Sequence, residues 1–188
     1  MKRPVVFLDR DGTINEEVGY LNHISRFRLL PRVGEALKLL KEAGFATVVV
    51  TNQSGIARGF FPESLVREVH HLLQEELSRF GAQLDGIYYC PHHPDEGCLC
   101  RKPRPGLIQK AASDLDLDLS RAYVVGDRFT DLLLAREINA CGVLVLTGYG
   151  RGELTYYLPR IGLEPDLVAE DLWEAAQKII AHEKNTSR

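Results

Sequence analysis

Several features that mark membrane, secreted and nucleic-acid-binding proteins are missing from this sequence. No apolar run approaches the ~20 residues that a membrane-spanning helix needs. The apolar run PVVFL near the start is too short for a signal peptide. The net charge is only −3 at pH 7 and the basic residues form no long run, which argues against a nucleic acid or a lipid surface as a partner. We therefore expect a cytoplasmic protein, and because no long apolar edge is apparent we expect a monomer.

Cysteine is also scarce, and its placement is uneven. The chain of 188 residues has four cysteines, of which Cys90, Cys98 and Cys100 lie close together while Cys141 stands apart. In a reducing compartment, clustered cysteines indicate metal binding rather than disulfide bonds. We expect the isolated Cys141 to belong to the core.

Short apolar runs alternate with helical periodicity along most of the chain. We predict strands at residues 4–8, 45–50, 86–90, 122–126 and 141–148, and helices at 33–44, 62–81, 106–115, 130–138 and 171–181. Strands that are apolar throughout and separated by helices form βαβ units, so the prediction is an α/β fold. Its core is a Rossmann-like parallel sheet with helices on both faces.

A single domain of residues 1–188 accounts for the whole pattern. A length of 188 residues suits one domain with a full core. No gap between the motifs described below is long enough for a separate cap domain, and the only sizeable irregular stretches are residues 13–31 and 90–101. Residues 182–188 are predicted to form a frayed tail.

Polar residues follow three of the predicted strands directly. Asp9 ends the first apolar run, Thr51 and Asn52 follow the second, and Asp127 follows the run YVVG. Ligands of parallel sheets bind at the carboxyl ends of the strands, so we expect these side chains to share one crevice.

The paired carboxylates of Asp9 and Asp11 indicate a bound cation. Two carboxylates at the end of a buried strand repel each other and are costly to desolvate, and a divalent cation relieves both problems. Oxygen ligands without a nearby histidine favour Mg²⁺. In GDRFTD, Asp127 adds a carboxylate, whereas Asp131 either joins the site or only begins a helix at its favourable dipole end.

A cation with hydroxyl, amide and lysine groups suits a phosphate ester, and either Asp9 or a water could attack the phosphorus.

The segment CPHHPDEGCLC has the spacing of a zinc site. Its candidate ligands are three thiolates and one imidazole, from Cys90, His92, Cys98 and Cys100. His93 is a second candidate for the imidazole ligand. A closed tetrahedral set leaves no position for water, so we expect a structural zinc in a short loop, residues 90–100, which fixes the backbone that carries Lys102.

Four motifs in order resemble those of the haloacid dehalogenase-like phosphohydrolases. They are DRDGTIN from Asp9, Thr51 after VVV, Lys102 in CRKPRPG, and Asp127 with Asp131 in GDRFTD. The resemblance implies that Asp9 attacks phosphorus to form an aspartyl-phosphate, and that Asp11 protonates the leaving alcohol and then activates water. It also implies that Thr51 and Lys102 stabilise the phosphoryl group. The implied Mg²⁺ ligands are Asp9, Asp127 and the backbone carbonyl of Asp11.

Within that superfamily, DRDGTIN, TNQSGIARG, the zinc loop and CRKPRPG resemble a subgroup that acts on a heptose bisphosphate or on histidinol phosphate. EEVGYLN looks like the substrate loop of the heptose enzymes, and arginines suit a second phosphate. The resemblance therefore implies a sugar-bisphosphate phosphatase that removes a 7-phosphate in lipopolysaccharide precursor synthesis, with a histidinol-phosphate phosphatase as the alternative. The implied substrate-binding residues are Glu17, Val18, Gly19, Tyr20, Asn52, Gln53, Ser54, Arg101 and Arg128.

Two further alternatives belong to other functional classes. One is a non-enzymatic module whose zinc loop binds a partner protein. A module that had lost catalysis would have lost Asp9 or Asp11, and both are present. The other is a nucleic-acid 3′-phosphatase, which would need a basic groove that the net charge of −3 disfavours.

Overall fold

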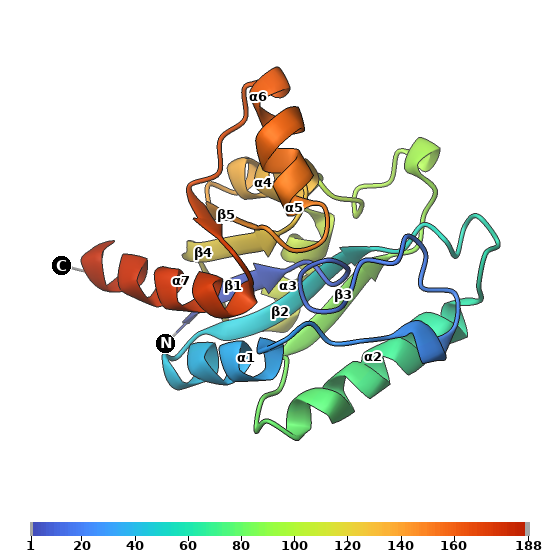
Figure 1. Ribbon diagram of the computed structural model, residues 1–188, viewed down its shortest axis with the longest axis horizontal. Helices are drawn as coiled ribbons and strands as arrows, with labels where there is room; N and C mark the ends of the chain where they lie inside the picture. Colours follow the sequence, from blue (N-terminus) through green and yellow to red (C-terminus); the bar gives the residue numbers. More distant parts are fainter. Residues whose placement is uncertain (1, 187–188) are drawn as a thin grey trace.

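A single six-stranded parallel sheet runs through the molecule in the order β3-β2-β1-β4-β5-β6 (Figure 1). The computed structural model describes residues 2–186. The chain builds the sheet outward from β1 in one direction and then in the other, so the order reverses between β1 and β4. Such a switch point opens a crevice at the carboxyl ends of the strands. The strands are β1 (Arg3–Leu8), β2 (Ala46–Asn52), β3 (Gly86–Cys90), β4 (Leu117–Gly126), β5 (Cys141–Val145) and β6 (Leu167–Ala169).

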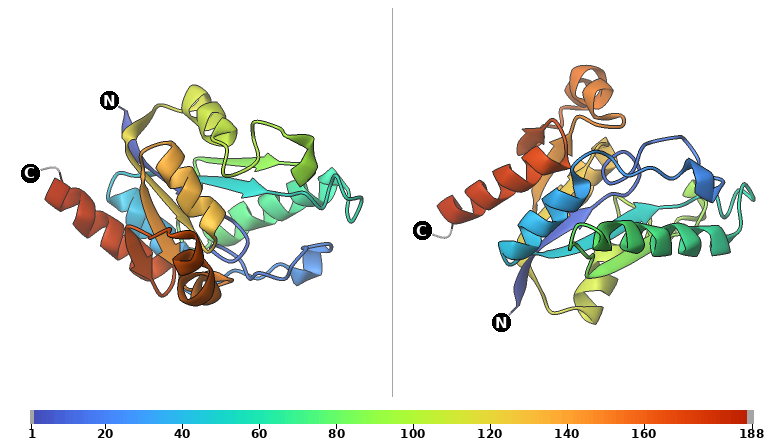
Figure 2. Two further views of the ribbon diagram at one scale, coloured as in Figure 1. Left: turned by 90° about the horizontal axis from the view of Figure 1, so that it is seen from above. Right: turned by 60° about the horizontal axis from the view of Figure 1, so that its bottom comes forward.

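Helices cover both faces of the sheet (Figures 1 and 2). On one face of the sheet, α1, α2 and α7 pack against strand residues such as Val6 and Val125. On the opposite face, α3 and α4 pack against strand residues such as Val5 and Val124. This arrangement confirms the predicted parallel sheet with helices on both faces, and residues 2–186 contain no separate cap domain. The α-helices are α1 (Val33–Glu42), α2 (Glu63–Ser78), α3 (Gly106–Asp114), α4 (Phe129–Glu137), α5 (Gly150–Gly152), α6 (Leu158–Ile161) and α7 (Leu172–Thr186). Shorter turns are η1 (Ile24–Arg26), η2 (Pro94–Glu96) and the π-helix η3 (Glu153–Tyr157).

The C-terminal third departs from the sequence prediction in two ways. The strand predicted for 141–148 ends at Val145, and the helical segment α5-η3-α6 and the short strand β6 that follow it were not predicted. The frayed tail is wrong for residues 182–186, which continue α7; the remaining two residues lie outside the described part of the chain. Tertiary contacts hold this end of the helix, because the Tyr123 hydroxyl donates to Glu183 at 2.9 Å and lies 2.9 Å from Nδ1 of His182.

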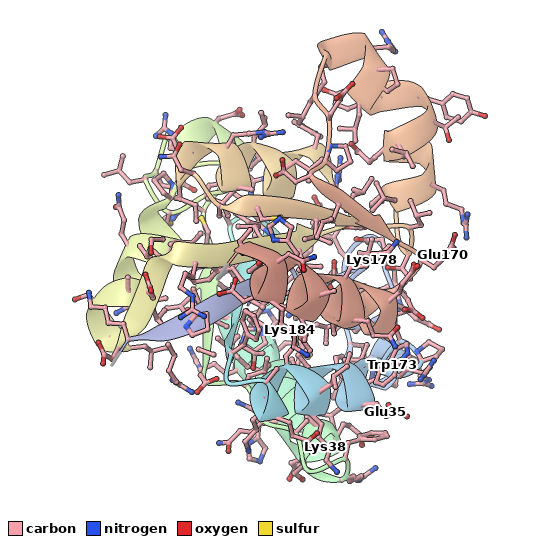
Figure 3. The ribbon with its side chains drawn as sticks, turned by 90° about the vertical axis from the view of Figure 1, so that its left-hand side faces the viewer. Glu35, Lys38, Glu170, Trp173, Lys178 and Lys184 are labelled. Carbon is pink, nitrogen blue, oxygen red and sulfur yellow. The ribbon has the colours of Figure 1, made fainter. Side chains whose placement is uncertain are left out.

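Helices α1 and α7 lie side by side on one face of the sheet (Figures 1 and 3). At the start of the pair, the guanidinium of Arg32 lies 4.0 Å from the ring centroid of Trp173. This cation–π contact joins the residue that precedes α1 to the first turn of α7. Across the described residues, none of the helices combines the length and apolar character of a membrane span.

Candidate active site

The carboxyl ends of the central strands surround a cavity of about 390 Å³. Asp9 directly follows β1, Thr51 and Asn52 end β2, and Asp127 directly follows β4. Because β2, β1 and β4 are neighbours in the sheet, these polar side chains meet at one edge, as the sequence predicted. The cavity is lined by Asp9, Asp11, Glu17, Gly19, Tyr20, Thr51, Asn52, Ser54, Arg101, Lys102, Arg128, Phe129, Thr130 and Tyr149.

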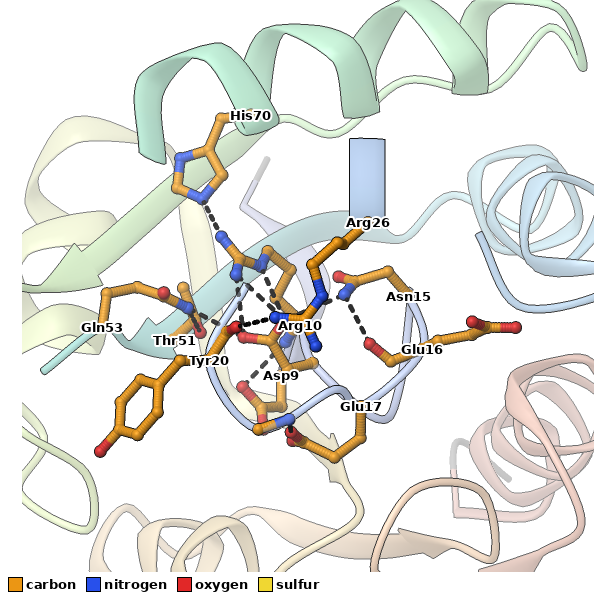
Figure 4. Close-up of polar contacts among 12 residues, drawn as sticks. Asp9, Arg10, Asn15, Glu16, Glu17, Tyr20, Arg26, Thr51, Gln53 and His70 are labelled. Atoms are coloured by element: carbon orange, nitrogen blue, oxygen red, sulfur yellow. Dashed lines mark hydrogen bonds and ion pairs between the residues drawn. The ribbon is translucent and has the colours of Figure 1, made fainter. Parts of the chain in front are cut away.

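Two of the predicted substrate-binding residues do not line this cavity. Val18 packs against the hydrophobic core, and Gln53 is buried, where its amide donates to Thr51 and to Asp11. Sequence position alone could not separate them from their neighbours, because successive residues of a loop point in different directions. The loop containing Glu17 and Tyr20 is held by Arg26, whose guanidinium donates to the carbonyls of Val18 and Tyr20 (Figure 4).

Lys102 lies buried between two carboxylates. Its Nζ is 2.9 Å from Oδ1 of Asp9 and 2.7 Å from Oδ1 of Asp131. Burial by itself lowers the pKa of an ammonium, but the charges of Asp131 and Asp9 outweigh burial and raise the pKa of Lys102 well above its usual value. The lysine is therefore charged at every physiological pH. Asn52 positions its backbone, since the Lys102 N–H donates to Oδ1 of Asn52 at 3.0 Å and the Asn52 amide donates to the Lys102 carbonyl at 3.3 Å.

The two oxygens of Asp9 have different surroundings. Oδ1 accepts the backbone N–H of Arg10 at 2.8 Å and the ammonium of Lys102. Oδ2 receives no hydrogen bond from residues 2–186, so one oxygen is anchored and the other is available for attack on a substrate. Burial, against the opposing charge of Lys102, raises the pKa of Asp9 to about 6.

Three residues donate hydrogen bonds to the carboxylate of Asp11, and Figure 4 shows these donors, Arg10, Asn15 and Gln53. Nη2 of Arg10 contacts both carboxylate oxygens at 3.0 and 2.9 Å, and the amides of Asn15 and Gln53 each donate at 2.9 Å. Burial disfavours the charged form, but the charge of Arg10 and these hydrogen bonds outweigh it and lower the pKa of Asp11. Arg10 is itself buried and donates to Nε2 of His70 at 3.2 Å. His70 stays neutral, because burial and the charge of Arg10 lower its pKa to about 3.

Asp127 is enclosed by backbone. A Cβ atom added at Gly12 or at Gly148 would overlap its carboxylate, so both positions require glycine. Its Oδ2 accepts the backbone N–H of Tyr149 at 2.8 Å, whereas the buried Oδ1 has no hydrogen-bond partner among the described residues. Burial, together with the negative charges of Asp9 and Asp131, raises the pKa of Asp127 to about 8.

These residues fit a magnesium ion. One oxygen each from Asp9, Asp127 and Asp131 lie within 4.8 Å of one another. A cation would supply the partner that the buried Oδ1 of Asp127 lacks and would neutralise the repulsion within the cluster. Asp131 already uses both oxygens, one with Lys102 and the other with the backbone N–H of Arg128 at 3.2 Å. Asp131 lies in the first turn of α4, which begins at Phe129, and it also pairs with Lys102, so it combines the two roles that the sequence left open.

The four predicted zinc ligands also meet in space. The sulfur of Cys90 lies 3.5 Å from that of Cys98 and 3.1 Å from that of Cys100, and Nδ1 of His92 lies 3.2 Å from the sulfur of Cys100. Thiolates ~2.3 Å from a tetrahedral zinc lie roughly 3.8 Å apart, so the cluster needs only a slight expansion to hold the ion. Nδ1 of His93 instead accepts the backbone N–H of Asp95 in the first turn of η2, which favours His92 as the ligand.

The comparisons with known proteins agree with this geometry. A family model described as polynucleotide kinase 3 phosphatase matches residues 4–133, and one described as HAD-hydrolase-like matches residues 99–175. A D-glycero-D-manno-heptose-1,7-bisphosphate 7-phosphatase from Thermosynechococcus vestitus is 42% identical over 97% of this chain and 98% of its own length. The chain belongs to the haloacid dehalogenase-like (HAD-like) phosphatases.

Two further relatives support the same placement. The D-glycero-beta-D-manno-heptose-1,7-bisphosphate 7-phosphatase of Escherichia coli K12 is 45% identical over 77% of this HAD-like phosphatase and 80% of its own length. A crystal structure of the D,D-heptose 1,7-bisphosphate phosphatase from B. bronchiseptica, complexed with magnesium and phosphate, superposes with a TM-score of 0.86 at 36% identity and covers 97% of this chain and 99% of that one. The predicted enzyme class, a phosphoric monoester hydrolase, is confirmed, and a magnesium cofactor is supported.

Sequence reasoning did not assign Arg10, Asn15, His70, Tyr149 or Glu153 to the active site of this HAD-like phosphatase. Arg10 stands between the two aspartates, and its position inside the motif was the available signal. Tyr149 stands between Gly148 and Gly150, a spacing that indicates close backbone approach. Asn15 ends the motif DRDGTIN and contacts Asp11 four residues before it, so its place in the motif was also an available signal. The contacts of His70 and Glu153 depend on the packing of distant elements, so no local pattern reveals them.

The raised pKa values of Asp9 and Asp127 predict a joint effect of pH and Mg²⁺ on stability. These values, about 6 and about 8, lie above the ~3.9 of an unfolded aspartate, so the folded protein binds more protons than the unfolded chain. Without metal, the folded protein should therefore become less stable as the pH rises from about 4 to about 8, because ionisation of these two carboxyl groups costs more in the folded state than in the unfolded chain. Mg²⁺ binds the ionised carboxylates, so it should raise Tm more at pH 8 than at pH 5. Thermal unfolding at both pH values, with and without Mg²⁺, measures this, and an equal shift at both would contradict the assignment.

Proposed function

We propose that this HAD-like phosphatase removes the 7-phosphate from D-glycero-D-manno-heptose 1,7-bisphosphate in a Mg²⁺-dependent reaction. The observation that carries the proposal is the 42% identity, over nearly the full length of both chains, to a phosphatase named for that substrate. The cavity of about 390 Å³ is lined by both carboxylates and arginines, and it suits a small phosphorylated sugar. By this proposal the protein supplies precursors for lipopolysaccharide synthesis.

The first step forms a bond between Asp9 and phosphorus. The available Oδ2 of Asp9 attacks, the bond from phosphorus to the sugar O7 breaks, and Asp11 gives its proton to the departing oxygen. Lys102 and the Thr51 hydroxyl stabilise the charge on the phosphoryl oxygens. Asp9, Asp127 and the backbone carbonyl of Asp11 would hold Mg²⁺, and the bound ion would balance the same negative charge. The second step uses Asp11 to take a proton from water, whose oxygen attacks phosphorus and releases inorganic phosphate and the Asp9 carboxylate.

Asp11 has a lowered pKa in the free protein, so it must gain a proton before the first step. The phosphate of a bound substrate brings further negative charge into the cavity that Asp11 lines. Negative charge nearby favours the protonated form of a carboxyl group. Substrate binding therefore shifts Asp11 toward the protonated state that a general acid requires.

Two arginines in the cavity wall are proposed to contact the second phosphate. Arg101 and Arg128 both line the cavity, and Nη1 of Arg101 is buried without a hydrogen-bond partner among the described residues. A buried guanidinium nitrogen without a partner favours an anionic ligand at that place. Histidinol phosphate would bring a cationic amine toward the same guanidinium groups, which favours the bisphosphate over it.

Zinc in the Cys90, His92, Cys98 and Cys100 cluster is proposed to fix the loop that delivers Lys102. A Cys98→Ser protein should lose its zinc and show a kcat lower by about 10- to 100-fold, because a small displacement of a catalytic group costs that much. Cys141→Ser, a half-buried cysteine outside the cluster, is the matched control and should retain both zinc and kcat. Zinc content by elemental analysis and phosphate release are measured together. Full activity after zinc loss would contradict this role.

We also propose that the single domain acts as a monomer in the cytoplasm. The reducing conditions of that compartment keep the clustered cysteines as thiols available to zinc.

The decisive experiment compares two substrates in parallel. The purified protein is incubated with Mg²⁺ and either the heptose bisphosphate or histidinol phosphate, with Asp9→Asn as the blank. Faster phosphate release from the heptose bisphosphate, absent in the blank, is expected. Preference for histidinol phosphate would transfer the function to that substrate, and release from neither would overturn the proposal.

A further inference from the structure

Arg128 lines the cavity, and two neighbouring side chains support its own side chain. It is the residue that precedes α4, and its backbone N–H donates to Asp131. Its guanidinium carbon lies 4.7 Å from the ring centroid of Tyr149, and its Nε lies 3.6 Å from Oε1 of Glu153. The side chain remains 44% exposed. The two contacts restrict the orientation of the Arg128 side chain, a restriction that a freely solvated arginine would not have.

Both supporting residues are themselves fixed. The backbone N–H of Tyr149 donates to Oδ2 of Asp127 at 2.8 Å, and a Cβ at Gly150 would overlap the carbonyl of Val145. The chain around Tyr149 is therefore packed tightly against the end of the sheet. Glu153 is buried, and its Oε2 accepts the backbone N–H of Phe129 at 3.1 Å. The segment after β5 is thereby connected to the first turn of α4, which Arg128 precedes.

The arrangement leaves part of the guanidinium group available. The ring face of Tyr149 and the carboxylate of Glu153 engage the plane and the Nε edge of Arg128. Its Nη1 and Nη2 atoms have no hydrogen-bond partner among residues 2–186. Those two nitrogens form one side of the donor fork that binds phosphate oxygens in a bidentate manner.

We propose that Tyr149 and Glu153 are positioning residues that hold Arg128 over the cavity to bind the phosphate that is not hydrolysed. The inference rests on the proposed function, because it requires a substrate with a second phosphate. An arginine already fixed in its binding orientation loses less conformational freedom when the ligand arrives. The effect is specific to substrates with a distal phosphate and leaves the chemistry at Asp9 unchanged.

The test compares heptose 1,7-bisphosphate with heptose 7-phosphate, which lacks the distal phosphate. Tyr149→Leu removes the aromatic face but keeps a large apolar side chain. We expect it to raise KM for the bisphosphate about 10-fold, with kcat and the KM for the monophosphate within about twofold of wild type. Tyr149→Phe keeps the aromatic face and should restore KM. Tyr156→Leu, on the exposed part of η3 and outside the cavity, is the matched control.

Two combinations complete the test. Arg128→Ala should also raise KM for the bisphosphate selectively, and the double variant with Tyr149→Leu should be no worse than Arg128→Ala alone, because Tyr149 acts through Arg128. Glu153→Gln should give a smaller rise, about threefold. Equal increases in KM for both substrates, or effects that multiply in the double variant, would overturn this inference while leaving the proposed function intact. A wild-type protein with the same KM for the bisphosphate and the monophosphate would overturn this inference alone, whereas one that releases no phosphate from the bisphosphate would overturn both.

Discussion

The Asp9→Asn protein is expected to release phosphate at least about a thousandfold more slowly than the wild type, while remaining folded. The amide has the size of the carboxylate but is a poor nucleophile, and it places an NH₂ group or a neutral oxygen where the reactive Oδ2 lies. Removing one negative charge from the cluster with Asp127 and Asp131 relieves repulsion, so the variant should unfold at a Tm equal to or above that of the metal-free wild type.

Two measurements distinguish a nucleophile from a metal ligand. Acid quenching of the reaction with phosphorus-labelled substrate should trap a covalent phosphoprotein in the wild type and none in Asp9→Asn. Asp118→Asn is the matched control and should behave as wild type, because Asp118 is a half-buried aspartate on β4, outside the cavity, that accepts hydrogen bonds from Ser120. Turnover by Asp9→Asn at near wild-type rates would mean that water attacks phosphorus directly, the alternative that residue spacing alone left open.

The second large effect is expected for Lys102→Met. The substitution keeps an unbranched side chain but removes the buried cation between Asp9 and Asp131. We expect kcat to fall by about 10²- to 10³-fold, the usual loss when a group that stabilises the transition state is removed. At pH 8 without Mg²⁺ the free energy of unfolding should fall by about 3–5 kcal/mol, because breaking a buried ion pair leaves uncompensated charges.

The pH dependence of that loss tests its cause. At pH 5 Asp9 and Asp127 are largely protonated, since their pKa values are about 6 and about 8. Fewer negative charges then need the ammonium of Lys102, so Lys102→Met should lower the free energy of unfolding less at pH 5 than at pH 8. Added Mg²⁺ at pH 8 should recover part of the lost stability. Urea unfolding at both pH values measures the change, with Lys110→Met as control, because the Lys110–Asp114 pair is exposed and contributes little. A loss that does not depend on pH would indicate a packing defect rather than unpaired carboxylates.

Features that depend on neighbouring residues were predictable. The apolar runs before Asp9, Asn52 and Asp127 specify strands, and parallel strands place their carboxyl ends at one edge, so the convergence of these residues followed from the pattern. The zinc ligands come from a segment of eleven positions, residues 90–100, whose spacing restricts how they can meet. Helix α7 shows the limit, because Tyr123 on β4 extends order to residues 182–186, where local composition indicated fraying.

The sequence by itself determined the sheet, the order of the motifs and the types of chemical groups at the site, because each depends on periodicity or short-range spacing. Only the tertiary structure decided which groups are paired. It joined Lys102 to Asp131, directed Asp11 toward Arg10, left an oxygen of Asp127 without a partner, and placed Tyr149 under Arg128. These contacts join segments far apart in the chain, and their strength depends on burial. Burial and long-range pairing arise only when the elements pack together.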